Sequence, residues 1–374
     1  MKPCTKKRCS FVLALGMLFS LSPTTAFAQT KQTQEAETVS VGFIKDGERS
    51  TLFNQNWKFF KGNPSGASET NFNDSSWRVL NLPHDWSIED EFTVQGEAES
   101  GFLLGGTGWY RKHFVVPEKF NGKDFTLNFD GIYMNAEVYV NGKKLGSHNY
   151  GYTAFAFDIT DELICDGITE NVISVKVSNP TPSSRWYSGS GIYRDVTLSV
   201  TDPIHVGYLG TTVTTPKLEN QKSGSVDVNV KTTIENESLS DSEVTLKTTI
   251  INKDGKEVSI PVSDKKVVQV NASVDFEQTV IVNKPTLWSV DNPTMYKVKT
   301  EVIVENKVVD TTLTDFGFRY YAFDRDTGFS LNGENMKLQG VCMHHDQGAL
   351  GAASNYYAVE RQMRIMKEMG ANAI

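Results

Sequence analysis

Cysteine is scarce in this sequence, with 4 residues among 374. Cys4 and Cys9 lie in an N-terminal segment that we expect to be removed, which leaves Cys165 and Cys342 in the mature chain. Two thiols so far apart do not resemble the dense framework of a disulfide-stabilised domain, so we expect them to be separate and partly buried. Cys and His residues with the spacing of a zinc site are also absent. The sequence therefore predicts no metal and no cofactor.

Positive charge is also in short supply. Lys and Arg number 37 against 45 Asp and Glu, a net charge of -8, which argues against a nucleic-acid binder with a broad basic face. Gly (29) and Pro (12) are too few for a collagen-like chain, and 22% charged residues do not fit a disordered one. Beyond the N-terminal segment, no apolar run approaches the ~20 residues that span a bilayer. We therefore expect a folded protein with neither a nucleic-acid partner nor a membrane partner after processing.

The N-terminus has the three parts of a secretory signal peptide. Four cations, from Lys2 to Arg8, precede an apolar stretch over residues 11–21, and Ala26-Phe27-Ala28 offers the small residues that a signal peptidase recognises. The apolar stretch is too short for a membrane anchor. The sequence predicts cleavage after Ala28 and export to the periplasm or the extracellular space.

Aromatic residues are plentiful, with 6 Trp, 13 Tyr and 21 Phe, which suits β-rich cores and sugar-stacking surfaces equally well. Residues 125–129, 136–140 and 172–177 alternate between apolar and polar residues, the pattern of half-buried antiparallel strands. Asn141-Gly142 is a strong signal for a tight hairpin turn. We interpret residues 29–204 as one β-sandwich, with Trp186 near its end and five other tryptophans as core or interface residues: Trp57, Trp77, Trp86, Trp109 and Trp288.

A second β block follows. Strand-like segments recur about every ten residues, a spacing typical of an immunoglobulin-like sandwich. The segments are residues 226–234, 244–251, 276–282, 296–304 and 308–313. We assign residues 205–318 to this domain. Its single His, His205, and its lack of Cys argue against catalysis inside it.

The pattern changes after Arg319. Residues 329–333 predict a hairpin, residues 337–341 a strand and residues 359–369 an amphipathic helix, with Gly370 as its stop. Another apolar run then begins at Ala371. A strand, loop, helix and strand open a parallel α/β unit, so we assign residues 319–374 to the incomplete beginning of a third domain.

Short motifs run through all three predicted domains in a fixed order. They are residues 82–86, 106–111, 130–131, 138–142 and 190–196 in the first; 285–289, 291–296 and 316–319 in the second; and 329–333, 337–341, 344–346 and 348–353 in the third. Together they resemble the β-galactosidase, β-glucuronidase and β-mannosidase group of glycoside hydrolases, family 2, and are most like a β-galactosidase. The resemblance implies a jelly-roll, galactose-binding-like sandwich, an immunoglobulin-like sandwich and the truncated start of a (β/α)8 TIM barrel.

The resemblance also implies an activity. Family members hydrolyse O-glycosidic bonds by a retaining mechanism, which requires two carboxyl groups about 5–5.5 Å apart. The two catalytic glutamates are expected beyond Ile374, so we expect no catalytic residue in this chain and no activity from it alone. Glu360 and Glu368 lie on the first predicted barrel helix, outside the barrel, whereas active sites form at strand ends.

Two segments are candidates for substrate binding. His344, His345 and Asp346 follow the first predicted barrel strand, where the resemblance implies sugar contacts; the competing interpretation is a loop whose polar groups hold one another. Arg185 and Trp186 lie where some relatives reach toward the sugar; the competing interpretation is that Trp186 and Tyr187 pack between domains and Arg185 forms an ion pair. Some β-galactosidases carry an acidic residue at the position of Arg185, so a charged substrate stays open.

Two other functions remain open at this point: a non-catalytic carbohydrate-binding protein and an immunoglobulin-like scaffold. The expected partner is a β-linked glycan or glycoside. The sequence does not decide the sugar, the linkage, or whether the protein is a homo-oligomer.

Overall fold

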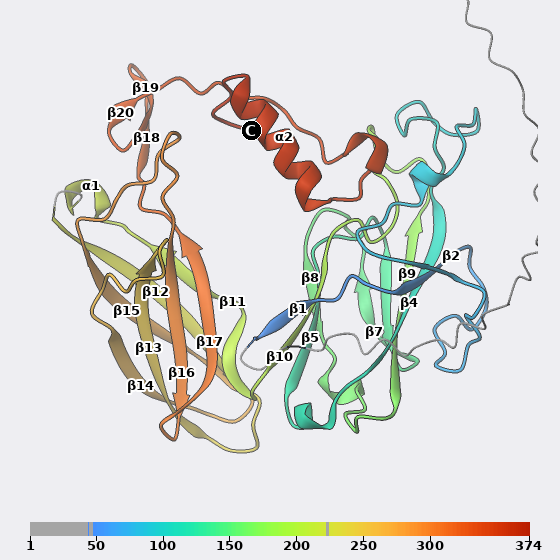
Figure 1. Cartoon of the computed structure of the whole chain (residues 1–374), viewed down its shortest axis with the longest axis horizontal. Coiled ribbons are helices and arrows are strands. Elements are labelled where there is room, and N and C mark those ends of the chain that lie inside the picture. The colour runs from blue at the N-terminus through green and yellow to red at the C-terminus, as the bar shows by residue number, and fades with distance from the viewer. Residues whose placement is uncertain (1–43, 45–47, 222–223) are drawn as a thin grey trace, which may run out of the picture. The chain divides into compact units, whose positions relative to one another are not determined.

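The computed structural model describes residue 44, residues 48–221 and residues 224–374. Strands dominate these residues, which form five sheets, and helices are few (Figure 1). The mainly β class predicted from the sequence is confirmed. The predicted signal peptide, residues 1–28, lies outside the described residues. Within the described part of the chain, no helix is long and apolar enough to cross a membrane.

The first sandwich has two antiparallel sheets, one of four strands in the order β1-β10-β5-β8 and one of six in the order β3-β2-β4-β9-β6-β7. The strands are β1 Ser50–Leu52, β2 Trp57–Lys61, β3 Arg78–Leu80, β4 Gly106–Val115, β5 Asp124–Phe129, β6 Ala136–Val140, β7 Lys143–His148, β8 Phe155–Asp158, β9 Glu170–Asn179 and β10 Val196–Thr201. Short 3-10 helices occupy three connections: η1 Ser87–Glu89, η2 Glu118–Phe120 and η3 Thr160–Glu162.

Alternating burial explains why these segments are strands. In β6, Ala136, Val138 and Val140 are fully buried, while the residues between them are half-buried. The predicted hairpin is also present, because Asn141 (φ 49°) and Gly142 (φ 85°) form the turn that joins β6 to β7. Four of the five tryptophans predicted to be core residues are buried and the fifth is half-buried: Trp57, Trp77, Trp86 and Trp109, then Trp288.

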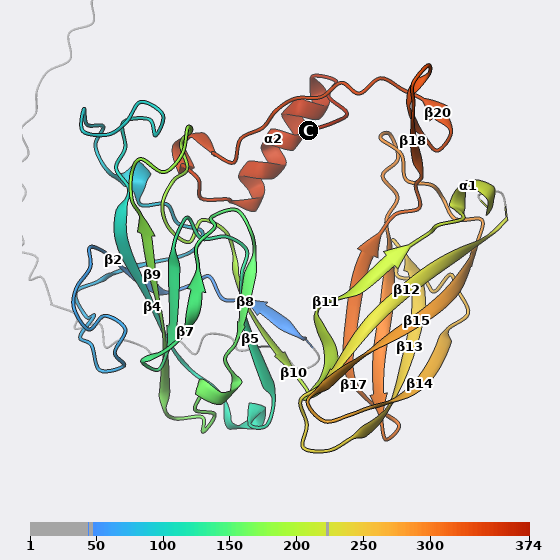
Figure 2. The same ribbon diagram turned by 180° about the vertical axis from the view of Figure 1, so that it is seen from behind.

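The second sandwich packs a three-stranded sheet, β11-β12-β15, against a four-stranded sheet, β14-β13-β16-β17 (Figure 2). The strands are β11 Ile204–Thr214, β12 Ser225–Asn236, β13 Ser242–Asn252, β14 Val262–Val268, β15 Ala272–Asn283, β16 Tyr296–Val304 and β17 Lys307–Phe316, with a short helix α1, Leu218–Gln221. Every segment predicted as a strand in this block lies within one of these. The domain boundaries drawn from the sequence stay predictions.

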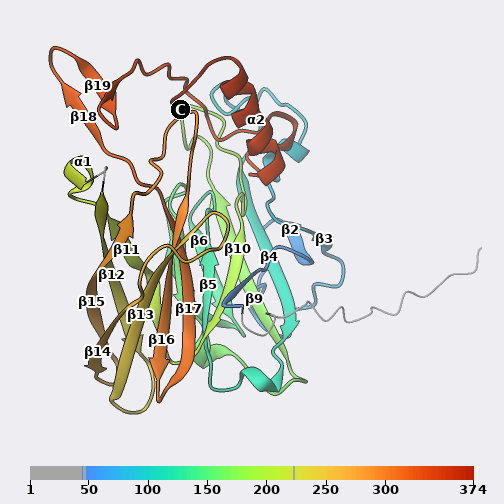
Figure 3. The same cartoon turned by 60° about the vertical axis from the view of Figure 1, so that its left-hand side comes forward.

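Residues after Arg319 form a small antiparallel sheet, β18 (Tyr321–Asp324), β19 (Gly328–Leu331) and β20 (Glu334–Asn335), then η4 (Gly348–Leu350) and helix α2 (Tyr356–Glu368) (Figure 3). The predicted hairpin is confirmed by β19 and β20. Helix α2 begins three residues before the predicted start, because the Asn355 side chain accepts hydrogen bonds from the first turn.

The strand predicted over residues 337–341 is wrong in its extent. Among the described residues its sheet pairing is one parallel bridge, between Gly340 and Ala373. The backbone bonds from Val341 N to Ala373 O (3.1 Å) and from Asn372 N to Gln339 O (3.0 Å) show the parallel direction expected for a β-loop-α-β unit. The start of a TIM barrel stays a prediction.

Two buried charges of the first sandwich are balanced differently. Burial opposes ionisation of Asp74, but hydrogen bonds from Lys58, His113 and Arg111 outweigh it and lower the pKa of Asp74 to about 2. Lys112 is fully buried, and burial lowers its pKa to about 8.

The two cysteines of the described chain are free, as predicted. Cys165 is half-buried as expected, whereas Cys342 is exposed, so the predicted partial burial is wrong for Cys342.

Candidate functional site

The centre of the candidate site is the buried carboxylate of Asp85. Its Oδ1 accepts hydrogen bonds from the backbone N–H of Ser87 (2.9 Å) and of Ser190 (2.9 Å). Its Oδ2 accepts one from the Ala352 N–H (2.8 Å) and one from the Tyr187 hydroxyl. One carboxylate therefore holds together three segments that are far apart in the sequence.

Two glycines permit this close approach. Gly351 has a φ of +61°, and a Cβ at this position would lie 2.3 Å from Asp85 Oδ2. Gly189 has a φ of +67°, and its Cβ would lie 2.5 Å from the Cβ of Ala352. Any other residue would meet both an unfavourable backbone conformation and a steric clash.

An aromatic patch lies beside this junction; we define it as Tyr150, Tyr152, Trp186 and His345. Trp186 Nε1 donates to the Tyr152 hydroxyl (2.8 Å), and Tyr152 contacts the rings of Tyr150 (5.8 Å between centroids) and His345 (5.4 Å). Trp186 is 42% exposed and Tyr150 59% exposed. The patch therefore presents aromatic surface to solvent with polar atoms at its edges.

His345, one of the predicted sugar contacts, is half-buried and points into the protein. Its Nε2 donates to the carbonyl oxygen of Ser188 (3.1 Å), and its ring packs edge-on against Tyr152 and Tyr193. This hydrogen bond sets the Nε2–H tautomer for the neutral ring. The contact favours a role in fixing the loop, while a sugar contact by His345 stays a prediction.

The remaining predicted residues are exposed. His344 and Asp346 flank His345, and Arg185 precedes Trp186. In the described chain Arg185 makes no ion pair, so the ion-pair interpretation of Arg185 finds no support there. Burial and the negative charges of Asp85 and then Asp346 raise the pKa of Tyr187, which keeps its hydroxyl protonated as a donor.

The structure thus brings Trp186 and His345 onto one patch through Tyr152, with Arg185 adjacent to Trp186 in the chain. The sequence did not single out Tyr150 or Tyr152, because Tyr-Gly-Tyr has no spacing that marks a site. Asp85 was visible in the sequence as part of the motif at residues 82–86, but its role as a shared acceptor was not.

Comparisons with known proteins agree with this organisation. The model of "Glycosyl hydrolases family 2, sugar binding domain" matches residues 92–203, and that of "Glycosyl hydrolases family 2" matches residues 207–319; together they cover more than half of the chain. The chain is 43% identical over 338 residues to the β-galactosidase BoGH2A of Bacteroides ovatus, and 30% identical over 351 residues to a β-glucuronidase of Bacteroides fragilis.

Solved structures show the same likeness. A glycosyl hydrolase family 2 member from Bacteroides cellulosilyticus matches 87% of the chain with a TM-score of 0.81 and 39% identity. The Bacteroides uniformis β-glucuronidase matches 86% with a TM-score of 0.77 and 31% identity. The chain spans only part of these proteins: 39% of the B. ovatus enzyme, 45% of the B. fragilis enzyme, and 42% and 38% of the two solved chains.

Proposed function

Since this chain belongs to glycosyl hydrolases family 2, we propose that it forms the sugar-binding, N-terminal part of an exported β-glycosidase. The whole enzyme would cleave β-linked, O-glycosidic bonds with retention of configuration. That mechanism needs a carboxylic acid that protonates the leaving oxygen and a carboxylate that attacks the sugar from the opposite face. In that reaction the residues of this chain would bind and orient the substrate.

The observation that carries this proposal is the junction at Asp85. It holds the segment with Trp186 against the segment with His345, so residues of the sugar-binding domain and of the predicted barrel start meet at one place. Aromatic rings pack well against the apolar faces of sugars, and the polar groups around them suit hydroxyl recognition. A neutral imidazole at His344 would donate to one hydroxyl and accept from another.

The carboxylates of helix α2 do not compete for the catalytic role. Glu360 pairs with Arg364 one turn later (2.7 Å), a contact that supports the helix. Glu368 is exposed at the end of the same helix. Both remain solvated-face residues in our interpretation.

The likeness to the B. ovatus β-galactosidase makes a β-galactoside the first candidate for the substrate of this protein. A β-glucuronide is the second candidate, because Arg185 is an exposed cation without an ion-pair partner among the described residues and would suit the carboxylate of a uronic acid. An R185Q variant separates the two: it should weaken binding of a β-glucuronide and leave a β-galactoside unaffected. Equal effects on both sugars would remove Arg185 from substrate selection.

Binding by the 374-residue chain tests the role of the patch. We expect W186A to weaken binding of the preferred sugar at least about fivefold in a calorimetric titration, because stacking on the indole is lost. The matched control is F323A, which removes an exposed aromatic from the hairpin β18–β19 and should change nothing. Equal affinity of W186A and the native chain would refute the patch as a sugar site.

Turnover separates the enzyme from a binding protein. The 374-residue chain should leave chromogenic β-galactosides, β-glucuronides and β-mannosides uncleaved, and the longer protein should cleave one of them. Glycan binding by residues 29–204 alone, with no turnover by the longer protein, would favour the non-catalytic alternative.

Export is proposed from the N-terminal sequence alone. Sequencing of the secreted protein should find Gln29 as the first residue. An intact Met1 in the mature protein would refute the cleavage site.

A further inference from the structure

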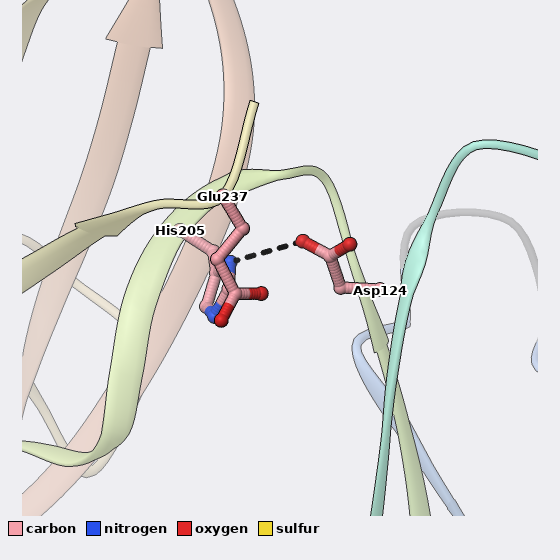
Figure 4. A group of neighbouring side chains, drawn as sticks. All are labelled: Asp124, His205 and Glu237. Atoms are coloured by element: carbon pink, nitrogen blue, oxygen red, sulfur yellow. Dashed lines mark ion pairs between the residues drawn. The ribbon is translucent and has the colours of Figure 1, made fainter. Parts of the chain in front are cut away.

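Three residues from separate segments meet away from the aromatic patch. Asp124 is the first residue of β5, His205 lies in β11 and Glu237 follows β12 (Figure 4). One nitrogen or oxygen atom from each lies within 4.8 Å of the others. They lie too far apart in the sequence to form a spacing motif.

The His205 side chain is buried and is hydrogen-bonded through one ring nitrogen. It is 8% exposed, and its Nδ1 donates to the carbonyl oxygen of Asp202 (2.9 Å). A backbone carbonyl at Nδ1 places the lone pair of neutral imidazole on Nε2, the usual arrangement of a metal-binding histidine. Among the described residues no hydrogen-bond donor faces Nε2, and the nearest charged atom is a carboxylate oxygen of Glu235 at 3.6 Å.

Asp124 supplies an independent observation. Its Oδ2 is buried and has no hydrogen-bond partner among the described residues, and it lies 3.8 Å from His205 Nδ1. A buried carboxylate oxygen without a donor is costly unless a cation or proton compensates it. The candidate ligand atoms of the three residues lie within 4.8 Å of one another, somewhat wider than the roughly 3–4 Å between atoms that share one Zn²⁺, so the side chains would draw together when the ion binds.

The surrounding charges leave a place for a cation. Lys123 is paired with Asp202 (2.6 Å) and Arg49 with Asp310 (2.7 Å), so the basic side chains nearby already have partners. Among the described residues Asp124 and Glu237 form no ion pair with Lys or Arg, while Glu235 also interacts electrostatically with Arg49. They line a cavity of about 260 Å³, which gives an ion a path to the site.

His113 provides a comparison, because it also lies beside two carboxylates but is arranged differently from His205. His113 also has two carboxylates, Asp74 at 2.7 Å and Glu170 at 2.8 Å, but they lie on opposite ring nitrogens. Asp74 is further neutralised by Lys58 and Arg111. His113 is therefore fully partnered, and His205 is not.

We propose that Asp124, His205 and Glu237 bind one divalent cation of the Zn²⁺ class. One imidazole nitrogen with two carboxylates suits a borderline ion better than Ca²⁺ or Mg²⁺, which prefer all-oxygen ligands. The ion would connect β5 of the first sandwich with β11 and the end of β12 in the second, and its role there is structural.

The test is a calorimetric titration of the chelator-treated 374-residue chain with ZnCl₂ at pH 7. We expect one saturable site, and a loss of affinity of at least about tenfold in H205Q, D124N and E237Q, since each removes a ligand. H113Q is the matched control and should bind as the native chain does. Glu237 is exposed, so E237Q reports on the ion even if a substitution at a buried position disturbs folding.

A second measurement uses Co²⁺ in place of Zn²⁺. The bound ion should give visible absorption bands that disappear in H205Q and persist in H113Q. The proposal is overturned if no stoichiometric Zn²⁺ binding occurs, or if H205Q and E237Q both bind as tightly as the native chain. Stronger binding of CaCl₂ than of ZnCl₂, unchanged in H205Q, would exclude the imidazole and equally overturn it.

Discussion

Replacement of Asp85 by Asn tests whether one carboxylate holds the candidate site together. The amide has the size of the carboxylate, but one of its two oxygens becomes an NH₂ group. That group would face two donors, either Ser87 N–H with Ser190 N–H or Ala352 N–H with the Tyr187 hydroxyl. Two hydrogen bonds are lost in either orientation, and the two buried donors that made them then face the NH₂ group, which is also a donor.

The magnitude follows from these contacts. A hydrogen bond to a charged acceptor contributes about 1.5–3 kcal/mol, so two of them amount to roughly 3–6 kcal/mol. Hydrogen exchange of the Ala352 backbone amide reports how much of this free energy is lost in the loop that contains Ala352. A loss of about 2 kcal/mol there corresponds to a roughly 30-fold faster hydrogen exchange over residues 344–354.

Hydrogen exchange followed by mass spectrometry is the assay, with urea unfolding monitored by tryptophan fluorescence as a second readout. Y187F removes one donor and keeps the carboxylate, so its effect should be smaller, about 2 kcal/mol. D254N, in an exposed turn of the second sandwich, is the control and should stay within about 0.5 kcal/mol of the native chain. Unchanged exchange over residues 344–354 in D85N would falsify the proposed role of Asp85.

Three further predictions concern other parts of the fold. G351A should destabilise the loop of residues 344–354 by at least about 3 kcal/mol, because it combines a positive φ with a clash against Asp85. G348A has open space around the added Cβ and should cost about 1 kcal/mol. Urea midpoints and hydrogen exchange of residues 344–354 compare the two variants. The pKa of Asp74, lowered to about 2, should add about 2 kcal/mol of stability that is present above pH 4 and lost as the pH falls toward 2; urea midpoints should show this loss in the native chain and a flatter profile in D74N. Burial lowers the pKa of Lys112 to about 8, so between pH 8 and 10.5 the unfolded chain holds a proton that the folded chain has released. The free energy of unfolding should therefore rise over this range by on the order of 3 kcal/mol. A K112M variant whose stability still rises over the same range would contradict this.

The sequence predicted strands best where one face of a sheet is buried. Residues 136–140 and 296–304 were predicted with the bounds of β6 and β16, because apolar residues alternate along them with period two. Strand β14 (Val262–Val268) was missed. It is an edge strand in which Asp264, Lys265 and Lys266 interrupt the apolar pattern, and it is held by backbone pairing with β13.

The segment at residues 337–341 shows the opposite error. Its apolar pattern was sufficient to predict a strand, but a strand requires a neighbour, and here the parallel partner is limited to residues 372–373. Helix α2 was predictable from its 3.6-residue periodicity, while its first residues depended on the cap at Asn355. Local pattern therefore identified the elements, and their partners decided their lengths.

The candidate site was likewise predicted only in part, because the sequence showed its residues but not their proximity. The motifs around Arg185, Trp186 and residues 344–346 were visible in the sequence, which also implied their family. Their proximity was not, because Asp85, Gly189 and Gly351 create it through contacts between residues more than 100 positions apart.

The sequence by itself determined the β class, the two sandwich-forming blocks and the family resemblance, since these rest on periodicity and on residues adjacent in the chain. Only the tertiary structure decided that one buried carboxylate joins three loops, that His345 turns toward Ser188 rather than solvent, and that Asp124, His205 and Glu237 converge. The physical reason is that hydrogen bonds, burial and charge balance depend on distance in space. A one-dimensional pattern records which side chains are available, and the packed chain decides which of them are left without a partner.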